Sequence, residues 1–151
     1  MSDPSIVLAN ALIGLGGTIT NAMNDDPSFV PCGRPAAFVM GNLAALGENL
    51  PDAEFAARAQ QTAALAEHVS DHHGARLASP YAGELTPVKR ELLNSLIELT
   101  GITLASLEGG AFSPEINAYL YRSLAALAVD DDAATAQLAQ LADITAKAKA
   151  L

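Results

Sequence analysis

The sequence predicts an all-α fold, a single-domain bundle of five to six helices over residues 1–151. Three observations support this prediction. Alanine accounts for 31 of the 151 residues, and alanine is the residue that enters a helix at the lowest free-energy cost. Trp is absent and aromatic residues make up 5% of the chain, so little in the composition favours a sheet. Five of the eight prolines stand at the start of segments with helical periodicity, where the missing N–H would have no helical partner anyway.

Glycine interrupts the first predicted helix, residues 4–24. Gly14, Gly16 and Gly17 lie inside this helix, and each costs about 1 kcal/mol relative to Ala in a helix interior. The three glycines predict a kink or a break near Gly16. The alternative is a smooth groove that allows a second helix to approach closely.

The same helix is apolar on more than one side. Leu8, Leu15 and Ile19 do not share a narrow stripe with Ile6 and Ile13, and a helix that is apolar most of the way round requires burial on two sides. We therefore predict a homodimer through this helix, with Leu8 and Ile19 in its interface. The alternative is a monomer that wraps the helix in its own core.

The remaining helices are predicted from proline placement and hydrophobic periodicity. They are expected over residues 35–48, 51–73, 87–108, 114–129 and 132–149. Helix 87–108 has two adjacent rows of apolar residues, so it is expected to lie at the centre of the bundle. Before the last helix, Asp130, Asp131 and Asp132 place negative charge at a helix N-terminus, where the helix dipole favours it.

All three histidines lie within the stretch EHVSDHHGAR, residues 67–76. On a helix, His68 and His72 are one turn apart and could bind one divalent transition metal ion, with Asp71 as a third ligand. A competent site needs further ligands, and none is identifiable in the sequence. The alternative is structural, because histidines in a last turn interact favourably with the helix dipole and Gly74 is a typical C-terminal stop.

Tyr121 and Arg122 form the predicted interaction surface. Leu120 and Leu124 are expected to face the core, which would turn Tyr121 and Arg122 outward. Tyr and Arg are enriched among the residues that contribute most to protein–protein binding. No nucleophile elbow, CxxC pair, phosphate-binding loop or paired ExxH motif is present, so no catalytic set and no cofactor are expected.

Charge and composition narrow the functional field further. The formal net charge is −9, with eight Lys and Arg against 17 Asp and Glu, which disfavours nucleic acid and anionic membrane surfaces as partners. The apolar run 6–19 is about fourteen residues, shorter than the about 20 that span a bilayer. The single cysteine, Cys32, and the absence of a basic leader predict a cytoplasmic protein.

These observations favour a non-enzymatic protein–protein interaction module of the adaptor, chaperone or inhibitor type. Its acidic surface would bind another protein, and a basic partner is electrostatically favoured. The alternative is a metal-binding or metal-dependent protein built on His68, Asp71 and His72, with a divalent transition metal as its cofactor.

Overall fold

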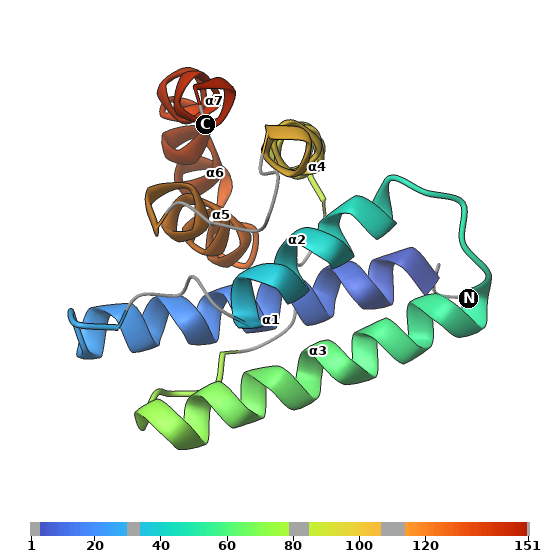
Figure 1. Ribbon diagram of the computed structural model, residues 1–151, viewed down its shortest axis with the longest axis vertical. Helices are drawn as coiled ribbons and strands as arrows, with labels where there is room; N and C mark the ends of the chain where they lie inside the picture. Colours follow the sequence, from blue (N-terminus) through green and yellow to red (C-terminus); the bar gives the residue numbers. More distant parts are fainter. Residues whose placement is uncertain (1–3, 30–33, 79–84, 107–113, 151) are drawn as a thin grey trace.

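The computed structural model describes residues 4–29, 34–78, 85–106 and 114–150, and these residues form helices and connections without a strand. The all-α prediction is confirmed. Seven helices lie within the described residues: α1 Pro4–Asp25, α2 Arg34–Leu46, α3 Asp52–His73, α4 Pro87–Ser106, α5 Pro114–Ala126, α6 Asp131–Leu138 and α7 Leu141–Lys149 (Figure 1). Cys32 and the end of the predicted helix 87–108 lie outside the described residues.

The prediction of five to six helices is too low because the last predicted helix, 132–149, divides into α6 and α7. Ala139 and Gln140 keep right-handed backbone angles at the junction, but the Gln140 N–H donates to the Gln137 carbonyl, three residues back, at 3.1 Å. The Tyr119 hydroxyl of α5 donates to that same carbonyl at 2.9 Å. The division therefore coincides with a contact from another helix.

Helix α1 is enclosed by its own chain. It packs against α2, α3 and α5, and Figure 1 shows α1 and α3 lying side by side. Five of its large apolar side chains are buried nearly completely: Leu8, Leu12, Leu15 and Ile19 are 0% exposed and Ile13 is 1% exposed. Two-sided burial was expected, but both sides are covered by helices of the same chain.

Glycine gives α1 close contacts without breaking it. The helix is continuous from Pro4 to Asp25, so the prediction of a break near Gly16 is wrong. A Cβ atom on Gly16 would lie 2.5 Å from Leu124 Cβ and 2.9 Å from the Tyr121 carbonyl oxygen of α5. A Cβ on Gly17 would lie 2.6 Å from Ala78 Cβ. The glycines therefore form the smooth surface on which α5 and the segment after α3 pack.

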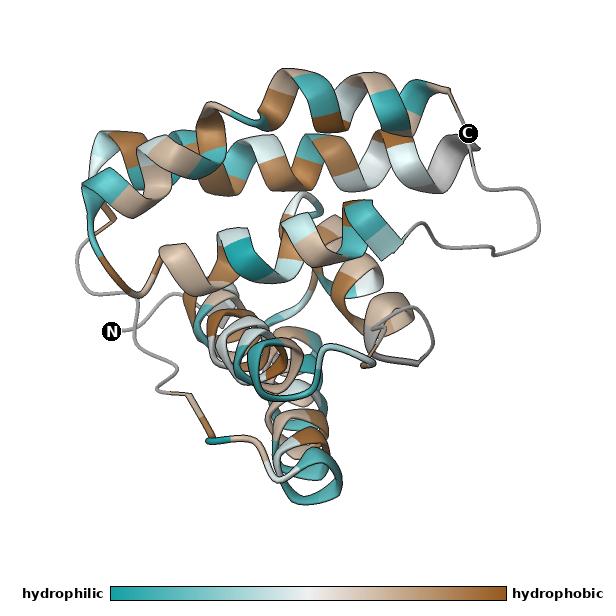
Figure 2. Ribbon diagram, turned by 90° about the vertical axis from the view of Figure 1, so that its left-hand side faces the viewer, coloured by the Kyte–Doolittle hydropathy of each residue, from teal (hydrophilic) through white to brown (hydrophobic). Residues whose placement is uncertain are grey.

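Helix α4 fills the other half of the interior. It packs against α2, α5, α6 and α7, and Leu92, Leu96 and Leu99 form its fully buried row. In Figure 2, hydrophobic and hydrophilic residues occupy different sides of the same helices, as expected for amphipathic helices around a shared core.

Polar contacts tie the second half of the chain together. Asp130 accepts a hydrogen bond from the Ala133 N–H at 2.9 Å and so caps α6, while the Thr86 hydroxyl donates to Asp131 at 2.6 Å and links the start of α4 to α6. Lys147 of α7 pairs with Glu115 of α5 at 2.6 Å. At least two members of the acidic run therefore have structural roles.

By length and composition, α1 is also able to cross a membrane. The apolar helix covers Ser5–Asp25, 21 residues, and its most apolar 18-residue window has a mean hydropathy of 1.5. It is longer than the apolar run 6–19. Core helices pass the same test, and 56% of the most apolar window of α1 is buried inside the fold.

Candidate interaction surface

The predicted pair Tyr121 and Arg122 is divided between the core and the surface. Arg122 is exposed, as expected. Tyr121 is 0% exposed, so the prediction that it faces solvent is wrong. The row of Leu120 and Leu124 predicted one buried side of α5. The helix is instead covered on more than one side, because it packs against α1, α4, α6 and α7. The sequence did contain a sign of this extensive burial, because Glu115 and Arg122 are the only charged residues of α5.

Leu8 and Ile19 are also in the core. Both side chains are 0% exposed, so they cannot contact a second copy of the chain in this fold, and their assignment to an interface is wrong. The exposed large apolar residues of α1 are instead Ile6 and Val7, at 45% and 44%. The homodimer stays a prediction. Ile6 and Val7 are the large apolar side chains of α1 that would be accessible to a second copy of the chain.

The predicted metal ligands lie together on the surface of α3 but do not form a three-residue site. His68, Asp71 and His72 are all exposed. The His68 and His72 rings are stacked, with centroids 5.8 Å apart and planes 10° apart. No group of three or more His, Cys, Asp or Glu side chains that could hold a metal ion occurs among the described residues. Asp71 therefore does not complete a site with the two imidazoles.

The histidines also take part in the helix end, as the structural alternative predicted. Gly74 adopts φ +63° and its N–H donates to the Ser70 carbonyl, which closes the last turn of α3. The His73 ring lies against Phe29, with centroids 4.0 Å apart. This contact joins the end of α3 to the segment that follows α1.

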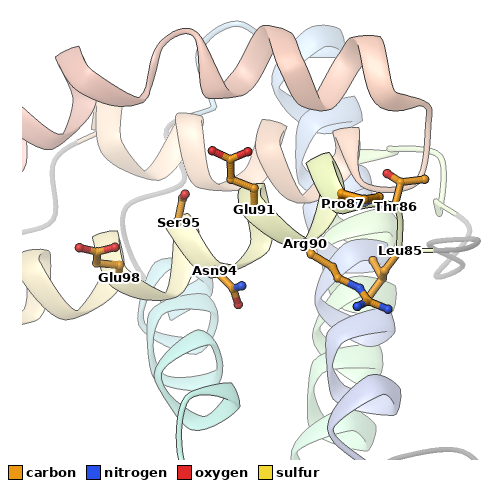
Figure 3. Close-up of a pocket in the computed structure, with 8 residues that line it drawn as sticks. All are labelled: Leu85, Thr86, Pro87, Arg90, Glu91, Asn94, Ser95 and Glu98. Carbon is orange, nitrogen blue, oxygen red and sulfur yellow. The ribbon is translucent and has the colours of Figure 1, made fainter.

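A polar groove runs along the outer side of α4. It has a volume of about 720 Å³ and begins at Leu85 and Thr86, ahead of the helix. In Figure 3, Arg90 and Asn94 point toward α1 and α2, while Glu91 and Ser95 point to the opposite side of α4. The four side chains thus form two polar edges, one of which carries a cation and the other an anion.

An apolar slot opens from the edge that holds Arg90 and Asn94. This slot has a volume of about 330 Å³ and shares Arg90, Asn94 and Leu85 with the polar groove. Its apolar lining comes from three helices: Ile6 and Ala9 of α1, Leu46 of α2, and Leu93 and Ile97 of α4. We call the groove and the slot together the α4 groove. Because its walls come from helices far apart in the sequence, periodicity alone could not reveal it.

The charged residues of the α4 groove form no ion pair with another described residue. Within the described part of the chain, ion pairs join Arg58 to Glu54 and Lys147 to Glu115. Arg90, Glu91 and Glu98, which all line the groove, belong to neither pair. A partner that brings opposite charges would therefore not have to break an existing ion pair.

Comparison with protein-family models, with curated proteins and with solved structures found no match to this chain. The functional argument consequently depends on the geometry and charge of the surface.

Proposed function

We propose that this protein is a non-enzymatic protein–protein interaction module and that its α4 groove binds an amphipathic, basic helix of another protein. One observation supports this most directly: an apolar slot with the exposed Ile6 at its edge opens into a polar groove whose charged residues form no ion pair within the part of the chain that the structure describes. Helix-in-groove binding requires this combination of an apolar cleft for anchor side chains and polar edges for orientation.

The dimensions of the surface suit a helix. Residues Arg90 to Glu98 line the groove over two turns of α4, which corresponds to about 12 Å at 1.5 Å per residue. A partner helix placed along them would present about two turns, with anchor residues spaced i, i+3 or i+4, and i+7. The slot beside Leu93 and Ile97 would accept the apolar anchors.

Charge selects the class of partner. The chain has a net charge of −9, and Glu91 and Glu98 line the groove without an ion pair among the described residues. Lys and Arg on a partner would be attracted to the surface before contact and positioned at these carboxylates. A second copy of the chain would also carry −9, so electrostatics favours a basic partner over self-association.

Arg90 and Asn94 would set the direction of the partner helix. Both lie at the junction between the apolar slot and the polar groove. An acidic side chain or a free C-terminal carbonyl of the partner would bind there, since Arg and Asn both donate hydrogen bonds. The basic residues of the partner would then lie toward Glu91 on the opposite edge.

Selection from a displayed peptide library tests this proposal. We expect the wild-type protein to enrich basic peptides with helical spacing of apolar residues. Ile6→Glu should weaken their binding at least tenfold, because it places a charge at the apolar slot. Val129→Glu is the matched control, because Val129 is 63% exposed and lines neither part of the groove. Equal binding to both variants, or enrichment of acidic peptides, would contradict the proposal.

A further inference from the structure

The stacked imidazoles of His68 and His72 are held by a well-defined helix end. Both residues lie within α3, one turn apart, and both are exposed. The turn that follows is closed by hydrogen bonds from the Gly74 and Ala75 N–H groups to the Ser70 carbonyl, and the Ser70 hydroxyl donates to the Ala75 carbonyl at 2.6 Å. The helix therefore continues through His72 without fraying at that position.

His73 supports the pair without belonging to it. Its ring packs on Phe29 and lies edge-on to the His72 ring, with centroids 4.9 Å apart. Phe29 in turn follows a turn in which Asp26 accepts hydrogen bonds from the Ser28 N–H and hydroxyl. The His72 ring thus neighbours both the His68 ring and the His73 ring, and the His73 ring is itself packed on Phe29.

We infer that His68 and His72 form a two-histidine site for one divalent late transition metal ion, of the class Cu²⁺, Ni²⁺ or Zn²⁺. Imidazole nitrogen is a preferred ligand for these ions, and residues at i and i+4 lie on the same side of a helix within reach of one ion. The helix would hold the two residues one turn apart before the ion arrives, and the rings would turn from their stacked arrangement so that one nitrogen of each points at the ion. The other coordination positions would be filled by water.

The surroundings favour a cation without supplying a third protein ligand. Glu67 and Asp71 are exposed beside the pair, and their carboxylates raise the local concentration of cations. His68 also lines a furrow of about 450 Å³ between α2 and α3, together with Phe38, Gln61 and Leu65. The imidazole is therefore accessible from the furrow. This site shares no residue with the α4 groove, so it is independent of the proposed partner site.

Titration of the tag-free protein with Cu²⁺ tests the inference. We expect one Cu²⁺ per chain and an electron paramagnetic resonance spectrum that shows coordination by two imidazole nitrogens. His68→Ala and His72→Ala should each weaken binding at least tenfold, since loss of even a supporting contact to a metal ligand costs 10–100-fold. Gln60→Ala is the matched control, because Gln60 is an exposed residue of the same helix about two turns before His68, and it should change the affinity less than twofold.

Unfolding provides a second readout that does not depend on spectroscopy. The unfolded chain does not hold the two rings one helical turn apart, so Cu²⁺ at 100 times its dissociation constant should shift the folding equilibrium about 100-fold toward the folded state. His68→Ala should abolish that shift. Affinity that is unchanged in His68→Ala and His72→Ala, or a spectrum of amine rather than imidazole coordination, would overturn the inference.

Discussion

A single methyl group added at Gly16 should lower the free energy of unfolding, because this residue lies at a close contact between α1 and α5. In Gly16→Ala, the new Cβ would lie 2.5 Å from Leu124 Cβ and 2.9 Å from the Tyr121 carbonyl oxygen. Both distances are shorter than van der Waals contact, and the second obstacle is backbone, so α1 and α5 must move apart. Overpacking of this kind costs about 1–3 kcal/mol, and the intrinsic helix preference of Ala returns at most about 1 kcal/mol. We expect a net destabilisation of up to about 2 kcal/mol.

Gly101→Ala is the matched control for this substitution. Gly101 also lies inside a helix, α4, but a Cβ there would meet nothing within 4 Å. The substitution therefore causes no clash, and Ala is favoured over Gly in a helix interior. We expect stabilisation of about 0.5–1 kcal/mol. Urea denaturation of both variants measures the two free energies of unfolding. The reasoning would be refuted if Gly16→Ala were as stable as Gly101→Ala, since α1 and α5 would then not be in close contact.

Two further predictions test the buried position of Leu8 and the contribution of Tyr119 to stability at different pH values. Leu8→Glu should abolish the helical circular dichroism spectrum, because Leu8 is 0% exposed and an unpaired buried charge costs several kcal/mol of the about 5–15 kcal/mol that stabilise a domain. The control Val7→Glu should fold normally, because Val7 is 44% exposed. A folded Leu8→Glu variant would contradict the buried position of Leu8. Tyr119→Phe should lose about 1 kcal/mol at neutral pH, because it removes the hydrogen bond to the Gln137 carbonyl. Burial raises the pKa of Tyr119 above 10.0, so its contribution to stability is present below pH 10 and is lost as pH rises through the folded-state pKa. Urea denaturation at pH 8 and pH 11 should therefore show a smaller difference between wild type and Tyr119→Phe at pH 11, and an unchanged difference would contradict this.

Helix beginnings were the part of the fold most readily predicted from the sequence. Helices α1, α4 and α5 begin at Pro4, Pro87 and Pro114, where a proline marked the expected start. Proline is informative there because its ring fixes φ and it donates no hydrogen bond, and both effects are local. The division at Ala139 and Gln140 had no such local signal. Both residues retain right-handed backbone angles, and the hydrogen bond from Tyr119 comes from a distant part of the chain.

The candidate surface was less predictable, because it depends on which sides of each helix are covered by neighbours. Periodicity identified an apolar side of α5 but not the second buried side that holds Tyr121. It also identified α1 as apolar on more than one side, without showing that the chain itself encloses Leu8 and Ile19. The α4 groove depends on Ile6 and Ile97 meeting across more than 90 residues of sequence. Such a meeting follows from tertiary packing and not from local spacing.

The enclosure of α1 has a consequence for synthesis of the protein on the ribosome. Helix α1 ends at Asp25, and its partner α5 begins at Pro114 and therefore 89 residues later. At about 5–20 residues per second, this interval lasts about 4–18 s. During this time, the side of α1 that α5 will cover lacks its final partner. A newly made chain thus exposes its most apolar helix for seconds, which makes α1 the segment of the nascent protein most in need of a holding chaperone.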